Sequence, residues 1–236
     1  MSMENIAGLK KGRVEALHDA IFAVAMTLLV LNLDVPQGAT SFGDFLRLLH
    51  AQLPSFCAGA IAFAIVGLVW LNNYYRNAMV MRVDVTHITL DIAAAGTIVL
   101  IPFSTRVLAE YWMHPWGVTI FSWNICAALL LYIAEGAHDV KHLIPKQVDQ
   151  KFLYLNLRLL WLYAFMTGVL VPAVALVSPL AAILMIPVVS ILNFYSRARL
   201  QPRFIEAHRV ALAYEEDTLA ASHGSGAVGH LGHERP

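Results

Sequence analysis

The chain has 236 residues, of which 58% are hydrophobic and only 14% are charged, and its mean hydropathy is +0.63. These values exceed what a soluble domain of this length normally carries, and they predict a membrane protein surrounded by lipids. Sixteen basic residues balance sixteen acidic ones, so no basic surface indicates a nucleic-acid partner.

Six segments of the chain are apolar over about the 20 residues that a membrane-spanning helix needs. They cover residues 14–33, 53–73, 86–108, 116–136, 156–177 and 180–195. Only Ser178 and Pro179 separate the last two segments, so we expect these to form a tight hairpin. The sequence therefore predicts an all-α membrane protein with six transmembrane helices.

Positive charges are unevenly distributed between the two sides of this predicted bundle. Lys and Arg residues gather before the first segment, in every second connection and after the sixth segment, whereas only Arg47 and Arg106 lie on the opposite side. Because cytoplasmic loops retain positive charge, the pattern predicts that both termini are cytoplasmic. We expect a multi-pass protein of the inner, or plasma, membrane of the cell.

The remaining segments are short. The stretch "FGDFLRLLH", residues 42–50, is predicted to form an amphipathic helix on the membrane surface. We divide the chain into a six-helix transmembrane domain at 1–199, a cytoplasmic helix at 200–222 and a flexible tail at 223–236, where the composition becomes polar.

A charged cluster opens the first apolar segment, in the stretch "RVEALHDAIFAVAMTLLVLNLDVP". It consists of Arg13, Glu15, His18 and Asp19. One interpretation is an electrostatic cluster at a helix start, where carboxylates suit the helix dipole. The other is that Arg13 and Asp19 connect neighbouring helices, since ionisable residues inside a membrane usually face protein or water.

Two further groups of ionisable residues attract attention. Asp91 follows His87 by one helical turn in the third segment, so we expect Asp91 to have a His, Arg or Asn partner on another helix, either as a structural pair or as a proton relay. In "EGAHDVKH", His138 and His142 share a helical face one turn after Glu135, a spacing that can hold zinc.

No metal or catalytic motif supports a more specific chemistry. Neither HExxH nor CxxC accompanies the histidines, so we expect a solvated helix end there, with no bound metal and no cofactor. Serine-nucleophile motifs and paired intramembrane carboxylates are likewise missing from the sequence, and we expect that the protein is not an enzyme.

The first segment resembles the signature of the transmembrane protein 175 family, the prokaryotic and lysosomal potassium channels. In that family the first helix starts with Arg, continues with Phe-Ser-Asp and leads into a Thr-Leu-Leu-x-Leu run. The matching residues are Arg13, Asp19, Phe22, Ala23, Thr27, Leu28, Leu29 and Leu31. Three later stretches, "VWLNNYYR", "RVDVTHITLD" and "LIPFSTRVLAEY", resemble its Trp-x-x-His, Arg-x-x-Asp and Pro-Phe motifs. The chain departs from the pattern where Leu17 and His18 replace Phe-Ser and Asn73 replaces the histidine.

The resemblance implies a homotetramer in which the first helix of each subunit lines a central pore for potassium ions. Val24, Leu28 and Leu31 share one helical face and would form apolar constriction rings, with Thr27 beside them. No TVGYG carbonyl filter is present in the sequence. The resemblance also implies a polar network at the pore entrance, made of Arg13, His18, Asp19, Asn73 and Asp91.

Other functions remain open at this point. An apolar stripe at helical spacing is commonly a packing face. A six-helix secondary transporter or proton-coupled carrier could use His18, Asp19, His87 and Asp91, and it would have glycine- or proline-broken helices near the middle of the membrane. A membrane-embedded enzyme or an assembly scaffold is a third possibility.

Overall fold

The structure is a computed structural model that describes residues 11–228, and every regular element in that range is helical. Six helical segments are long and apolar enough to cross a membrane. They are Lys11–Asn32, Leu53–Asn77, Val85–Glu110, Pro115–His142, Gln150–Val177 and Pro179–Ser196. The predicted all-α class and the six predicted spans are confirmed, although the fourth and fifth helices extend more than a turn beyond their predicted segments.

Several spans consist of more than one element. The first is α1 (Lys11–Leu28) followed by a 3-10 turn, η2 (Leu29–Asn32), and the third is α4 (Val85–Val99) followed by α5 (Ile101–Glu110). The fifth is α7 (Gln150–Phe165), the π-helical turn η3 (Met166–Leu170) and α8 (Val171–Val177). The other elements are α2 (Phe42–Ala51), α3 (Leu53–Asn77), α6 (Pro115–His142) and α9 (Pro179–Val228).

Local sequence explains where several helices begin. The side chains of Ser41, Asp84 and Asp149 accept hydrogen bonds from backbone N–H groups in the first turns of α2, α4 and α7. Such caps satisfy donors that the helix itself leaves free. Pro102, near the start of α5, lacks an N–H group and accompanies the break between α4 and α5.

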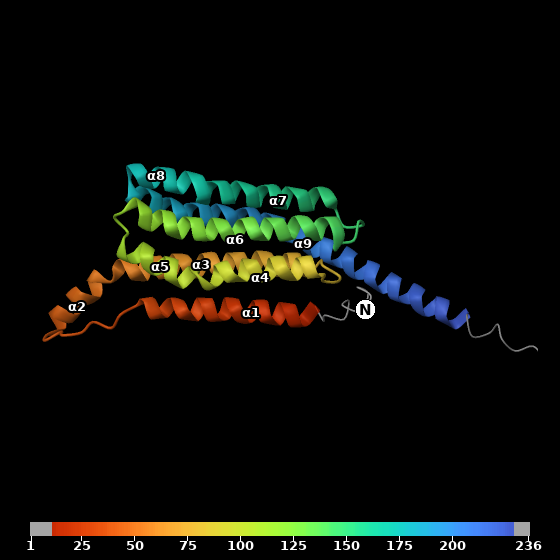
Figure 1. Ribbon diagram of the computed structural model, residues 1–236, viewed down its shortest axis with the longest axis horizontal. Coiled ribbons are helices and arrows are strands. Elements are labelled where there is room, and N and C mark those ends of the chain that lie inside the picture. The colour runs from red at the N-terminus through yellow and green to blue at the C-terminus, as the bar shows by residue number, and fades with distance from the viewer. Residues whose placement is uncertain (1–10, 229–236) are drawn as a thin grey trace, which may run out of the picture.

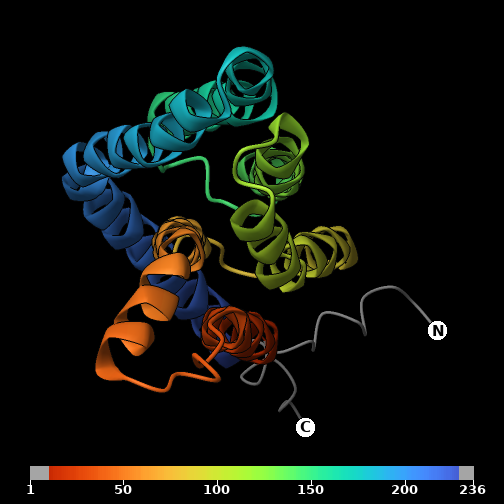
Figure 2. The same cartoon turned by 90° about the vertical axis from the view of Figure 1, so that its left-hand side faces the viewer.

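The helices form an elongated bundle with α1 along one edge (Figure 1). Viewed from the end, α7 and α8 lie on the side of the bundle opposite α1 (Figure 2). α1 packs against α3 and α4, whereas α6 contacts α4, α5, α7 and α8 and so occupies a central place. The predicted amphipathic helix is α2; it projects from the bundle and has no buried residue.

A π-helical turn lies within the fifth span. Pro172 has no N–H group to donate to the carbonyl of Gly168 one turn earlier. The indole Nε1 of Trp123, on α6, donates a hydrogen bond of 3.1 Å to that carbonyl instead. A π-helical turn and a hydrogen bond from a neighbouring helix thus accompany the proline within this span.

α9 continues without interruption from the sixth span to Val228, with Pro187 and Pro202 inside it. The region predicted as a separate helix at 200–222 is thus the continuation of the sixth span. Phe204 anchors it, because its ring packs 5.5 Å from that of Tyr75 and 4.8 Å from that of Phe152. Of the predicted tail, residues 229–236 lie outside the described residues.

Candidate pore helix and buried polar network

One face of the first span is packed against the rest of the subunit and the other is open. His18, Phe22, Ala25 and Leu29 follow each other at helical spacing and are each at most 4% exposed. The three predicted constriction residues lie on the open side. Val24 is 55% exposed, Leu28 38% and Leu31 67%. The predicted apolar face is therefore not used to pack this subunit together.

The end of the first span is wound more tightly than predicted. Leu29–Asn32 is 3-10 helical, so Leu28 and Leu31 lie almost directly in line along the helix axis. The Thr27 hydroxyl donates a 2.8 Å hydrogen bond to the carbonyl of Val24. Its proton is thus engaged by the helix backbone.

The structure brings together three of the five residues predicted for the polar network. Asn73 Nδ2 lies 2.8 Å from His18 Nε2, and His18 Nδ1 lies 2.7 Å from Asp91 Oδ1. All three residues are at most 5% exposed. His18 is therefore the interhelical partner that was expected for Asp91, and it connects α1 to α3 and α4.

The other two predicted network residues lie elsewhere. Asp19 is exposed and accepts a 2.8 Å hydrogen bond from the indole Nε1 of Trp70, which ties α1 to α3 by a second route. Arg13 is exposed and forms no ion pair with another residue of the described range. Glu15 pairs instead with Lys11, at 3.5 Å.

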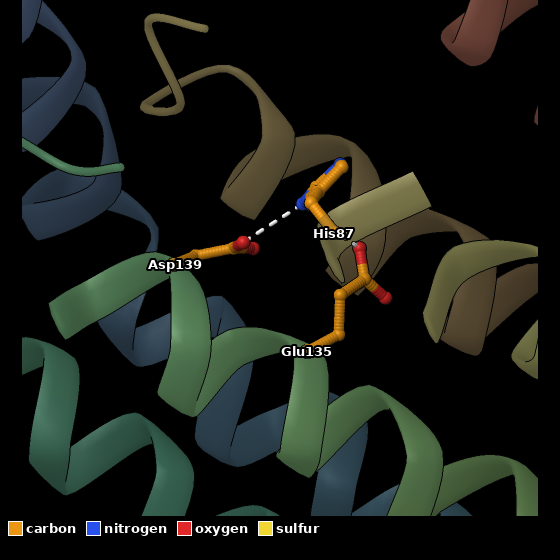
Figure 3. A group of neighbouring side chains, drawn as sticks. All are labelled: His87, Glu135 and Asp139. Carbon is orange, nitrogen blue, oxygen red and sulfur yellow. Dashed lines mark hydrogen bonds and ion pairs between the residues drawn. The ribbon is translucent and has the colours of Figure 1, made fainter. Parts of the chain in front are cut away.

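A second buried cluster lies next to this network and joins α3, α4 and α6. Its residues are Arg76, His87, Glu135 and Asp139, all at most 3% exposed. Arg76 Nη2 lies 2.6 Å from Glu135 Oε1, and Arg76 Nε lies 3.4 Å from Asp139 Oδ2. His87 Nδ1 is 2.7 Å from Asp139 Oδ1 (Figure 3).

The ligating atoms of His87, Glu135 and Asp139 lie within 4.8 Å of one another, which is close enough to hold a metal ion. However, the Arg76 guanidinium already contacts both carboxylates and supplies the positive charge that they need. The arrangement is therefore that of a buried ion network, and we assign no metal to it.

His138 and His142 lie side by side, with ring centroids 4.9 Å apart, but Glu135 does not join them. Glu135 points into the subunit, whereas His138 Nε2 lies 2.8 Å from Asp84 Oδ2 and His142 is exposed. Burial alone would raise the pKa of Asp84, but hydrogen bonds from the His87 backbone N–H and from His138 outweigh it and hold that pKa below its usual range. These contacts secure the start of α4 to the end of α6.

Sequence reasoning missed Arg76 because it was counted as a positive loop charge. The expectation that paired intramembrane carboxylates are missing was wrong, because α6 runs to His142 and buries both Glu135 and Asp139. A usable signal was present, since these two carboxylates are four residues apart in the sequence and fall on one face of a helix that spans both. Two carboxylates on one face inside a membrane protein favour a cation as partner, and Arg76 lies at the end of the second span.

Comparison with known proteins decides the family. The model of the family described as "Endosomal/lysosomal potassium channel TMEM175" matches residues 13–102. A potassium channel of Streptomyces collinus is 37% identical over 146 residues, which cover 59% of this chain and 70% of that protein. The chain belongs to the TMEM175 family.

Other members of the TMEM175 family agree with this assignment. A potassium channel of Chamaesiphon minutus is 36% identical over 105 residues, which are 44% of this chain and 52% of that one. The crystal structure of a lysosomal potassium-selective channel TMEM175 homolog from the same organism has a TM-score of 0.69 and 23% identity. It covers 80% of this chain and 97% of its own, and it shows that the fold is shared.

Membership of the TMEM175 family bears on the alternatives. The family is one of ion channels, so the expectation that the protein is not an enzyme is confirmed. The two departures from the family pattern, His18 and Asn73, are hydrogen-bonded to each other. The chain thus has a histidine on the first helix and an amide on the second where the family pattern has a serine and a histidine.

Proposed function

We propose that the protein is a homotetrameric potassium channel of the plasma membrane, with six spans per subunit and both termini in the cytoplasm. Its TMEM175 relatives are named as potassium channels, which supports the permeant ion. The helix α1 of each subunit lines the central pore, and membrane lipids surround the outer helices.

The observation that carries the proposal is the division of α1 into three faces. His18, Phe22 and Ala25 face the subunit, while Val24 and Leu28 project from it. Next to Val24 and Leu28, and roughly opposite the buried face, lies an exposed stripe of small side chains. It consists of Ala16, Ala20, Ala23 and Thr27. Small residues let transmembrane helices approach closely, so this stripe suits contact with neighbouring copies of α1 around an axis.

The constriction acts through dehydration. Rings of Val24, Leu28 and Leu31 around the axis offer no hydrogen bond to water, so an ion must lose part of its hydration shell in passing. The side chains of all three rings are hydrocarbon, and the nearby Thr27 hydroxyl already donates its proton to the Val24 carbonyl. A polar side chain at the ring would retain water and lower the barrier.

The test compares two neighbouring leucines. Leu28 is 38% exposed and Leu29 is 4% exposed, since they differ by about 100° around the helix. We expect Leu28→Asn to increase cation flux through protein reconstituted in planar bilayers and to weaken the discrimination of potassium from sodium, as measured by reversal potential. We expect Leu29→Asn to lower stability instead. Leu130 on α6, which is 40% exposed, provides a control of matched exposure outside α1.

Mass measurement of the purified protein in nanodiscs accompanies the recordings, and we expect a tetramer. A stable monomer or dimer would contradict the proposal. Equal flux changes in the Leu28→Asn and Leu130→Asn variants would also contradict the proposal, because the effect would then not be specific to a residue on α1.

A further inference from the structure

At one end of the buried polar network, Arg76 can only donate hydrogen bonds, and this fixes which of its neighbours donate and which accept. Arg76 Nη2 donates a hydrogen bond to Asn73 Oδ1. A guanidinium has five N–H donors and no acceptor, so only the oxygen of the Asn73 amide can face it. The orientation of this amide, which carries an oxygen on one side and an NH2 group on the other, is therefore set by Arg76.

This orientation determines the protonation of His18. The Nδ2 group of Asn73 lies 2.8 Å from His18 Nε2, and an amide NH2 group can only donate. His18 Nε2 must then accept, which means that it carries a lone pair. The ring proton resides on Nδ1, the nitrogen that lies 2.7 Å from Asp91 Oδ1.

We infer that Arg76 is a positioning residue that holds His18 as the neutral tautomer protonated on Nδ1, and that this tautomer fixes the rotation of α1 against α3 and α4. A histidine beside a carboxylate is ordinarily a candidate for a charged pair. Here a charged His18 would direct its Nε2–H at the NH2 group of Asn73, so that two donors would face each other without an acceptor.

Arg76 can impose this direction because α6 holds it from the other side. Its Nη1 donates a 2.8 Å hydrogen bond to the backbone carbonyl of Tyr132, and the Glu135 and Asp139 carboxylates contact its Nη2 and Nε. Groups on α6 therefore fix the position of Arg76 on α3, and Arg76 in turn fixes the orientation of the Asn73 amide that contacts His18 on α1. In this way the central helix α6 determines the hydrogen bonds that hold the edge helix α1.

The consequence for conduction rests on the proposed function. Val24 and Leu28 belong to the same helix as His18 and face away from the subunit while His18 faces into it. A rotation of α1 about its own axis that moved His18 away from Asn73 would turn the constriction residues by the same angle and so change which side chains face the pore. The tautomer itself can be measured whether or not the protein conducts.

The experiment is nitrogen NMR of the full-length protein in nanodiscs with 15N-labelled histidine, in which His18 is assigned by its loss in His18→Gln. In the wild-type protein at neutral pH we expect the His18 resonances of a protonated Nδ1 and an unprotonated Nε2. In Asn73→Asp, a near-isosteric change, the new carboxylate can only accept, so we expect both nitrogens of His18 to be protonated.

Two variants of Arg76 distinguish the effect of its hydrogen-bond direction from the effect of its side-chain size. Arg76→Lys keeps a side chain that only donates and should preserve the wild-type tautomer, whereas Arg76→Gln can donate or accept and should give a mixture of tautomers. A protonated Nε2 in the wild-type protein, or a His18 spectrum unchanged by Asn73→Asp, would overturn the inference. The expected tautomers in a protein without potassium flux would support it and refute only the proposed function.

Discussion

Replacing Arg76 by methionine should be among the most destabilising single changes in this protein. The substitution keeps an unbranched, flexible side chain but removes the guanidinium that contacts both Glu135 and Asp139. Only the His87 ring, at 3.6 Å and 2.7 Å from the two carboxylates, then remains beside them among the described residues. Each of these carboxylates is 0% exposed, so water cannot replace the guanidinium. Removing one partner of a buried ion pair costs about 3–5 kcal/mol, because the other charge is left uncompensated. We expect a loss of that size in the free energy of unfolding.

The measurement is unfolding of the protein in nanodiscs, followed by tryptophan fluorescence. The control is Arg47→Met, which removes a chemically similar pair with Asp44 at 3.2 Å on α2, where Arg47 is 78% exposed. We expect no measurable loss from this control, because solvent screens such a pair. A variant that combines Arg76→Met with Glu135→Gln and Asp139→Asn should recover much of the stability. Equal losses from Arg76→Met and Arg47→Met, or no recovery in the triple variant, would refute the reasoning.

Three smaller predictions follow from individual contacts. His18→Ser and Asn73→His together restore the family pattern, and we expect each change alone to lower the free energy of unfolding. The double variant should lose less than the sum of the two single losses, with a coupling energy of about 0.5–3 kcal/mol in a double-mutant cycle of unfolding measurements. Additive losses would contradict the contact between the two residues. A Cβ at Gly168 would lie 2.5 Å from the sulfur of Cys126, so Gly168→Ala should cost about 1–3 kcal/mol, part of which Cys126→Ala restores in the same assay. Folding lowers the pKa of Asp84, so this carboxylate stabilises the protein above its unfolded pKa of about 3.9, and the stabilisation is lost as the pH falls through the lower folded pKa. Asp84→Asn should therefore remove this part of the pH dependence of unfolding. A pH dependence identical to that of the wild-type protein would contradict the prediction.

Much of the architecture is readable from the sequence because the bilayer imposes a length and an apolar composition on each span. That constraint located all six helices, and the amphipathic pattern located α2. The expectation that Asp91 needs a partner on another helix was also sound, since His18 lies 2.7 Å away. In each case the prediction needed only one segment of the sequence, or one ionisable residue inside a span.

The buried ion network could not be assembled in the same way. Hydropathy averages over a whole helix, so it does not tell which side of α6 faces the subunit, and Glu135 was grouped with the exposed His142. Arg76 appeared at the end of a span, where arginine is ordinary, and its partners are 59 and 63 positions further along the chain by residue number. Only the packing of α3 against α6 decides that these charges meet.

The π-helical turn at Met166–Leu170 has a consequence for how the fifth span tolerates changes in length. A π turn holds one residue more than the α-helical ladder around it would use, because its hydrogen bonds reach one residue further. Deleting a single residue there would convert the turn to regular α-helix while leaving both flanking pieces facing the same neighbours. A deletion within α7 or α8 would instead rotate everything beyond it by about 100° and turn buried positions such as Tyr163 or Val171 away from the core. The fifth span thus carries a built-in place where the chain can shorten by one residue without losing its register.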